Sequence, residues 1–332
     1  MSEISKVQNN EFYKKWKEQE ERFDNLDKKS REQEERVNDS EKKDREQEER
    51  VNVFEKRSKE EEEIFIEEEK ERRDSEFIDK MYIVKELNDI VERNRKYAQF
   101  GQVASYIPEL KHAIKSDLGV CIVDREQNIY CAGEYDKKFT IQSISKTVLL
   151  AMALMEYGYD FVKTQVGFEP SDNPFNSIVS IGSNNATKPS NPMLNSGAIV
   201  ITSLVKGRNL EEKEKSMLDY FRKFANNDSL KINYDVYESE KKTGERNRAM
   251  AHLLKSNGFI DGDVEEILDL YFRQCSIEVT SKDLAMMGLN FATQGHLFAK
   301  LNGFKDHEYI ITKDVAKIVK AVMLTCGMYD GS

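Results

Sequence analysis

A serine and a lysine stand one helical turn apart at the start of a long apolar run. The stretch FTIQSISKTVLLAMALM, residues 139–155, places Ser143 three residues ahead of Lys146, and the run from Val148 onward is apolar on nearly all sides. Positions three apart share one face of a helix, so the lysine side chain can reach the serine hydroxyl. Apolar neighbours lower the pKa of an ammonium, which makes an uncharged lysine feasible as the base that a serine nucleophile needs.

The spacing alone is weak evidence, because Ser-x-x-Lys also occurs at Ser40, Ser203 and Ser239, where no catalysis is implied. The alternative interpretation of Ser143 is an ordinary helix start, in which its hydroxyl caps the helix. Its location after a predicted hairpin and ahead of a buried helix favours chemistry, since serine acylases of the penicillin-binding class use this arrangement.

The elements around this pair are predicted to be mostly helical. Two short strands, 119–123 and 128–132, are joined by a polar turn, and a helix over 139–155 follows them. A loop rich in Pro, Asn and Ser comes next, and a structured loop of this length is usually functional. Further helices are predicted from apolar spacing and from cap residues such as Thr280. Their ranges are 77–98, 198–205, 249–256, 281–294 and 313–326.

The first eighty residues differ in composition from the rest, because the first glycine is Gly101 and the first proline is Pro108. The segment EQEER occurs three times at a step of fourteen residues, each time before an apolar residue. Fourteen residues are two heptads, which indicates a weak coiled coil that oligomerises the protein. A single charged helix with Glu–Lys and Glu–Arg pairs is the competing interpretation, and a disordered charged tail is a third. We predict a charged helical or coiled-coil arm over 1–80 and a catalytic domain over 81–332.

Composition excludes several classes of protein. A net charge of −10 argues against a nucleic-acid binder, because phosphate contacts need a basic surface. The four cysteines form no CxxC pair and the four histidines show no ligand spacing, so we expect no zinc site, no disulfide framework and a reducing compartment. The N-terminal residues lack a secretory pattern, and no apolar stretch approaches the ~20 residues of a membrane helix. We therefore expect a soluble cytoplasmic protein without a membrane partner.

A series of longer sequence motifs, in chain order, carries a family resemblance. They are GQVASYIPEL, QSISK, KPSNPMLNSGAIVITSL, ERNRAMAHLLKSNG, LYFRQCSIEVTSKDLAMMG and CGMYDGS. Together they closely resemble the glutaminase family, over residues 81–332. The resemblance implies an α+β fold of the β-lactamase/transpeptidase-like type, hydrolysis of L-glutamine to L-glutamate and ammonia without a metal or organic cofactor, and a homo-oligomer.

The resemblance also implies a set of site residues. Ser143 would be the nucleophile, Lys146 its base, and Tyr329 a residue that relays protons near the serine. Glu240 would receive the substrate α-ammonium, although its charged surroundings in YESEKKTGERN would otherwise favour a solvated position. The remaining expected substrate-binding residues are Asn195, Asn247 and Tyr271, which would bind carboxylate and amide, the substrate-contacting Tyr106, and Gln142 at the pocket border.

The sequence departs from the family pattern at its C-terminal end. Family members continue beyond the MYDGS region into a glycine-rich segment with a PAKSG-type motif and further strands, whereas this sequence stops at Ser332. The resemblance places the second oxyanion donor and most of the central sheet in that segment, so we expect a truncated domain. A catalytically impaired chain that acts as an assembly or interaction protein is therefore a second hypothesis. A different serine acylase of the same fold, such as a penicillin-hydrolysing enzyme, is a third.

Overall fold

The computed structural model describes residues 17–18, 22, 56, 65–67, 69–70, 77–171, 174–177, 188–294 and 310–328. The chain divides into two units, Met1–Asp79 and Lys80–Ser332. Most of the predicted arm over 1–80 lies outside the described residues, and so does Tyr329. Among the helices that the structure describes, none combines the length and the apolar character that crossing a membrane requires.

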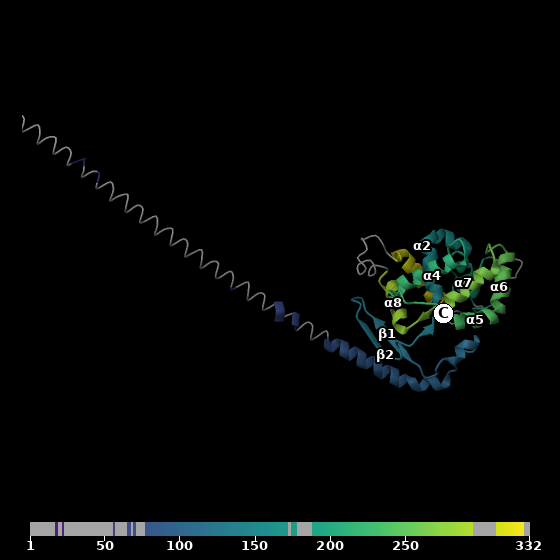
Figure 1. Ribbon diagram of the computed structural model, residues 1–332, viewed down its shortest axis with the longest axis horizontal. Helices are drawn as coiled ribbons and strands as arrows, with labels where there is room; N and C mark the ends of the chain where they lie inside the picture. The colour runs from purple at the N-terminus through teal and green to yellow at the C-terminus, as the bar shows by residue number, and fades with distance from the viewer. Residues whose placement is uncertain are drawn as a thin grey trace, which may run out of the picture. The chain divides into compact units, whose positions relative to one another are not determined.

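A helix and a β-hairpin form the first packed element of the larger unit. Residues 77–95 are helical, and the buried Leu87 and Val91 pack against Tyr130 and Ala132. The hairpin consists of two antiparallel strands, with Val120 opposite Ala132, and its β1 strand also packs beside helix α8 (Figure 1). The bounds of these elements are Gly119–Val123 for β1, Ile129–Gly133 for β2 and Ser281–Ala292 for α8.

The main core is helical and is centred on α7, Val264–Cys275, which packs against α3, α4, α5 and α6 (Figure 1). The other helices of this core are α2 Ser145–Gln165, α3 Asn195–Ser203, α4 Leu210–Ala225, α5 Tyr234–Thr243, α6 Glu245–Ser256 and α10 Lys313–Cys326. Helix α2 is buried from Ser145 to Leu154 on most of its surface, as its apolar sequence predicts. The predicted helix at 313–326 is found with its expected bounds, and those at 249–256 and 281–294 are found within four residues of theirs.

Local capping explains where α8 begins. Asp283 N–H donates to Thr280 Oγ1 at 3.2 Å, and Thr280 N–H donates to Asp283 Oδ2 at 2.7 Å. Each side chain therefore satisfies a backbone N–H that the first helical turn leaves without a partner. The predicted cap at Thr280 is confirmed.

The predicted helix over 139–155 is wrong at its start. Phe139–Thr140 forms strand β3, which pairs with β4, Glu278–Val279, and a 3₁₀ turn over Gln142–Ile144 separates it from α2. Because β3 and β4 lie far apart in the chain, hydrophobic periodicity contains no signal for their pairing. The two strands tie the segment before Ser143 to the segment that follows α7.

Two of the cysteines are joined, against the expectation that the scattered cysteines are all reduced. Cys121 and Cys131 lie directly opposite each other in the hairpin and form a disulfide, with 4.2 Å between their Cα atoms. A separation of ten residues gives no CxxC pattern, and only the strand register brings the two side chains together. Cys275 and Cys326 are free and buried.

Candidate active site

Ser143 lies in the middle of the 3₁₀ turn η3, Gln142–Ile144, immediately before α2 begins. The turn places Ser143 three residues before Lys146, which lies in the first turn of α2. Ser143 is half-buried and lines a cavity. The positive end of the α2 dipole lies beside it and favours negative charge that develops on its oxygen.

Lys146 is buried, with 2% of its surface exposed. Its Nζ donates to the Met193 carbonyl at 2.7 Å and to Asn195 Oδ1 at 2.8 Å. Burial lowers the pKa of Lys146 to about 8, although the charges of Cys275 and Glu240 act in the opposite direction. The amine is therefore far closer to its uncharged form at neutral pH than an exposed lysine is.

The loop before α3 holds the Met193 carbonyl in reach of Lys146. Asn191 Oδ1 accepts from the Met193 and Leu194 N–H groups, at 3.0 and 3.1 Å, and so fixes a tight turn. Gly197 lies against this turn, because a Cβ at that position would be 2.1 Å from the Asn191 carbonyl oxygen. Only glycine allows so close an approach of helix α3 to the loop.

Asn195 connects Lys146 to a second amide. It accepts from Lys146 through Oδ1, and its Nδ2 donates to Asn247 Oδ1 at 3.2 Å. The Asn247 Oδ1 accepts this bond, so the Asn247 amide is oriented with its Nδ2 as a donor. Both asparagines line the cavity, so the chain of bonds offers amide donors suited to a carboxylate or a carbonyl oxygen.

Glu240 is buried on α5, with 8% of its surface exposed. Among the described residues its Oε2 has no hydrogen-bond partner. Burial raises the pKa of Glu240 to about 8, while the charge of Lys146 acts in the opposite direction. A buried carboxylate oxygen without a donor is costly, and a ligand ammonium placed against it would remove that cost.

Ser143, Asn195, Asn247 and Glu240 line one cavity of about 390 Å³, whereas the Lys146 side chain is not part of its lining. The size suits a small molecule. A larger hollow of about 510 Å³ is lined by none of the predicted residues, and one of about 820 Å³ is lined by two of them, Tyr106 and Gln142. Of the nine predicted site residues, seven line the smaller cavity: Tyr106, Gln142, Ser143, Asn195, Glu240, Asn247 and Tyr271.

The mouth of the cavity is shaped by Tyr106 and Gln142. Tyr106 Oη donates to Gln142 Oε1 at 3.3 Å, and Gln142 Nε2 donates to Thr140 Oγ1 at 2.9 Å. The segment after Tyr106 is attached to α5, because Glu109 N–H donates to Ser239 Oγ at 3.2 Å. Tyr106 is thus placed near Ser143 from a distant part of the chain.

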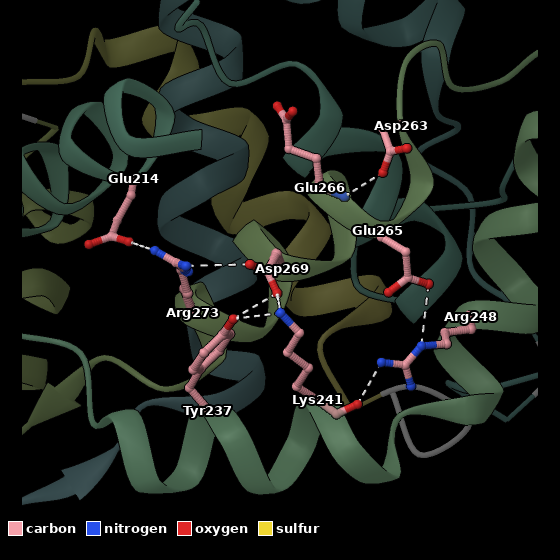
Figure 2. A network of polar contacts seen from close by, with 9 residues as sticks. All are labelled: Glu214, Tyr237, Lys241, Arg248, Asp263, Glu265, Glu266, Asp269 and Arg273. Atoms are coloured by element: carbon pink, nitrogen blue, oxygen red, sulfur yellow. Dashed lines mark hydrogen bonds and ion pairs between the residues drawn. The ribbon is translucent and has the colours of Figure 1, made fainter. Parts of the chain in front are cut away.

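An ionic network fixes α5, which carries Glu240, against α7, which carries Tyr271 (Figure 2). Tyr237 Oη donates to Asp269 Oδ1 at 2.7 Å, and Lys241 Nζ lies 2.5 Å from the same oxygen. Arg273 contacts the other Asp269 oxygen at 3.3 Å and also pairs with Glu214 of α4. Burial raises the pKa of Asp269, but the hydrogen bonds from Lys241 and Tyr237 outweigh it, and that pKa lies below its ordinary value.

Replacing Asp269 with asparagine is expected to destabilise the protein by about 2 kcal/mol at pH 7, because Lys241 loses its counter-ion and Arg273 keeps only Glu214. An acid with a lowered pKa stabilises the fold above its unfolded pKa and loses that effect as pH falls through its folded pKa. The difference from wild type should therefore shrink below about pH 4. Urea unfolding at several pH values measures it. Glu245→Gln, which breaks the exposed Glu245–Arg248 pair, is the control and should change little. Equal losses for both variants would contradict the expectation.

Cys275 is among the residues that line the cavity and that sequence reasoning missed. It lies four residues after Tyr271 on α7, and both line the cavity. Positions four apart share a helix face, so the predicted binding role of Tyr271 could have indicated that Cys275 also faces the site. Burial strongly raises the pKa of the Cys275 thiol, with the charge of Glu240 acting in the same direction. The thiol is therefore protonated at neutral pH and is a poor nucleophile.

Comparison with known proteins gives a consistent result. The glutaminase family model matches residues 101–332. A glutaminase of Clostridioides difficile (strain 630) is 57% identical over 246 residues, which cover 74% of this chain and 78% of the relative. The crystal structure of a probable glutaminase of Bacillus subtilis has a TM-score of 0.67 and 37% identity, covering 75% of this chain and 74% of that chain.

A second structure of similar fold captures a covalent complex. It is a Bacillus subtilis glutaminase joined to 5-oxo-L-norleucine by reaction of the protein with 6-diazo-5-oxo-L-norleucine, at 36% identity and a TM-score of 0.65. It covers 75% of this chain and 76% of that chain. These neighbours confirm the predicted α+β, β-lactamase-like fold. The chain belongs to the glutaminase family.

Proposed function

We propose that this chain hydrolyses L-glutamine to L-glutamate and ammonia through an ester formed on Ser143. The observation that carries the proposal is the buried Lys146 amine, held by Met193 and Asn195 in the helical turn next to Ser143. A neutral amine has two protons and one lone pair. Lys146 donates protons to Met193 and Asn195, and the lone pair of the neutral amine is proposed as the group that takes the Ser143 proton.

The chemistry then proceeds in two steps. Lys146 takes the proton of Ser143 as Oγ attacks the carboxamide carbon, and it returns this proton to the leaving nitrogen, which departs as ammonia. Water then attacks the glutamyl ester, Lys146 takes the water proton and returns it to Ser143 Oγ, and Ser143 leaves as its alcohol. The Ser143 N–H at the start of α2 is proposed as one donor to the developing oxyanion. Tyr329 is proposed as a proton relay and lies outside the described residues.

The cavity offers complementary groups for each part of the substrate. Glu240 is proposed to receive the α-ammonium, because its Oε2 is buried without a partner among the described residues. Asn195, Asn247 and Tyr271 are proposed to bind the carboxylate and the amide, with Tyr106 and Gln142 at the mouth of the cavity. The covalent complex of the Bacillus subtilis relative supports a nucleophilic side chain in this family.

The test is ammonia release by the purified chain, with L-asparagine as the matched amide that is one methylene shorter. Turnover of L-glutamine with little turnover of L-asparagine supports the proposal. The alternative is an impaired chain that acts as an assembly protein. It predicts no turnover of either amide, so the same assay separates the two.

The value of kcat/KM for L-glutamine is expected to fall as pH drops below about 8. Lys146 must lose its proton to act as a base and Glu240 must lose its proton to bind the ammonium, and both pKa values lie at about 8. Because both groups must be deprotonated, the slope of log(kcat/KM) against pH should approach two on the acid side. The Glu240→Gln variant should show a slope of one and a KM about 10- to 100-fold higher. A flat profile between pH 6 and 9 would contradict both assignments.

A further inference from the structure

Three buried polar side chains link α2, α3 and α7 behind the cavity. Gln274 Nε2 donates to Ser145 Oγ at 2.9 Å, and Thr202 Oγ1 donates to Gln274 Oε1 at 3.0 Å. The exposed fraction is 0% for Ser145 and Gln274 and 1% for Thr202. Apolar side chains of the same shape would pack here without desolvating any polar group. The choice of polar residues therefore needs a reason other than packing.

The network holds one end of the turn that carries Ser143. Ser145 is the first residue of α2 and its hydroxyl is bound by Gln274, near the end of α7. The other end of the turn is held by the Ile141 N–H, which donates to the Ile277 carbonyl at 2.9 Å. The end of α7 and the residues directly after it thus hold the turn on both sides of Ser143.

The turn needs this support because its backbone is strained. Gln142, directly before Ser143, has φ of 51°, in the left-handed region that residues other than glycine seldom adopt. Such conformations persist only where the surrounding structure imposes them. A reacting atom displaced by about 1 Å reduces a rate by about 100-fold. Loosening one end of the turn would therefore affect the chemical step directly.

The same network reaches the wall of the cavity. Ser145 also hydrogen-bonds the thiol of Cys275, which lines the cavity. Thr202 lies seven residues after Asn195 in α3, which is two turns along the same face. Each of the three helices therefore carries both a residue of the network and a residue of the site.

We propose that Gln274 is a positioning residue of the glutaminase reaction. Its amide, acting through Ser145, holds the Ser143 turn in the geometry in which Lys146 takes the serine proton. The inference rests on the proposed function and gives Gln274 no contact with the substrate. Its loss should therefore lower kcat while KM for L-glutamine changes little.

The first test is Gln274→Met, which keeps the length of the side chain and removes its bond to Ser145. The kcat for L-glutamine is expected to fall about 10- to 100-fold, with KM near its wild-type value. Asn290→Leu is the matched control, because it removes a similarly buried amide, which donates to the Phe224 carbonyl at 2.8 Å, and leaves the Gln274–Ser145 bond in place. Its kcat should stay near the wild-type value. Melting temperatures of both variants report any general loss of stability.

The second test is a double-mutant cycle with Ser145→Ala, a change of one hydroxyl that helix propensity tolerates well. If Gln274 acts through Ser145, the double variant should be no slower than the slower single variant. The rate of covalent labelling by 6-diazo-5-oxo-L-norleucine, followed by mass spectrometry, should show the same pattern independently of turnover.

The outcomes separate this inference from the proposed function. Wild-type kcat in Gln274→Met, an equal loss in Asn290→Leu, or losses in the Gln274→Met and Ser145→Ala variants that multiply would each overturn the inference alone. A wild-type chain that neither releases ammonia nor takes up the label would overturn the proposed function, and the inference with it.

Discussion

Replacing Ser143 with alanine is expected to lower kcat for ammonia release from L-glutamine by at least ~10⁴-fold. The variant keeps the cavity and its polar groups, so it should still bind the substrate. It cannot form the ester, and what remains is the small catalysis that binding and electrostatics provide without a nucleophile. A coupled ammonia assay, extended over hours, has the range that this measurement needs.

The control for Ser143→Ala is Thr147→Ala, one turn further along the same segment. Thr147 Oγ1 donates to the Ile144 carbonyl at 2.8 Å and does not line the cavity. Its loss removes a hydroxyl from the same segment without removing the nucleophile, and kcat should stay near the wild-type value. If Ser143→Ala keeps more than a tenth of the wild-type kcat, the nucleophile lies elsewhere.

Replacing Lys146 with methionine is expected to reduce kcat by about 10³- to 10⁴-fold, because the serine loses its base. Lys146→Arg should be as slow, since a guanidinium stays protonated and cannot accept the serine proton. Stability should change little in the methionine variant, because two effects oppose each other. Two oxygen acceptors lose their donor, at Met193 and Asn195, while a cation no longer has to be buried.

Lys163→Met is the matched control for this loss, because Lys163 is an exposed lysine on the same helix. It should have wild-type kinetics. Recovery of kcat in Lys146→Met at high pH would show that another group can serve as the base, and would contradict the assignment of Lys146.

Features that depend on neighbouring residues were predictable from the sequence. The apolar run after Lys146 marks α2 as buried, and a lysine inside such a helix has its pKa lowered by burial. The capping box of Thr280 and Asp283 fixes the start of α8 within one residue. In these cases the interacting groups lie within one or two helical turns, so their spacing in the chain specifies their contact.

Features that depend on distant pairing were not predictable in the same way. The strand at Phe139–Thr140 exists because Glu278–Val279 lies beside it, and the Cys121–Cys131 bond follows from strand register. Glu240 lies in a charged run that favours a solvated position by composition alone. It is buried because Tyr237 and Lys241, on the same helix, are bound to Asp269 of α7.

The titration of the Lys146 amine tests most directly whether an uncharged lysine activates Ser143. NMR spectra of protein labelled with ¹³C at the lysine ε-carbon, with Lys146→Met for assignment, follow this one amine across the pH range. Burial predicts a midpoint of about 8 for the pKa of Lys146. A midpoint above about 10, the value of an exposed lysine, would leave the amine fully charged at neutral pH and contradict its role as the base.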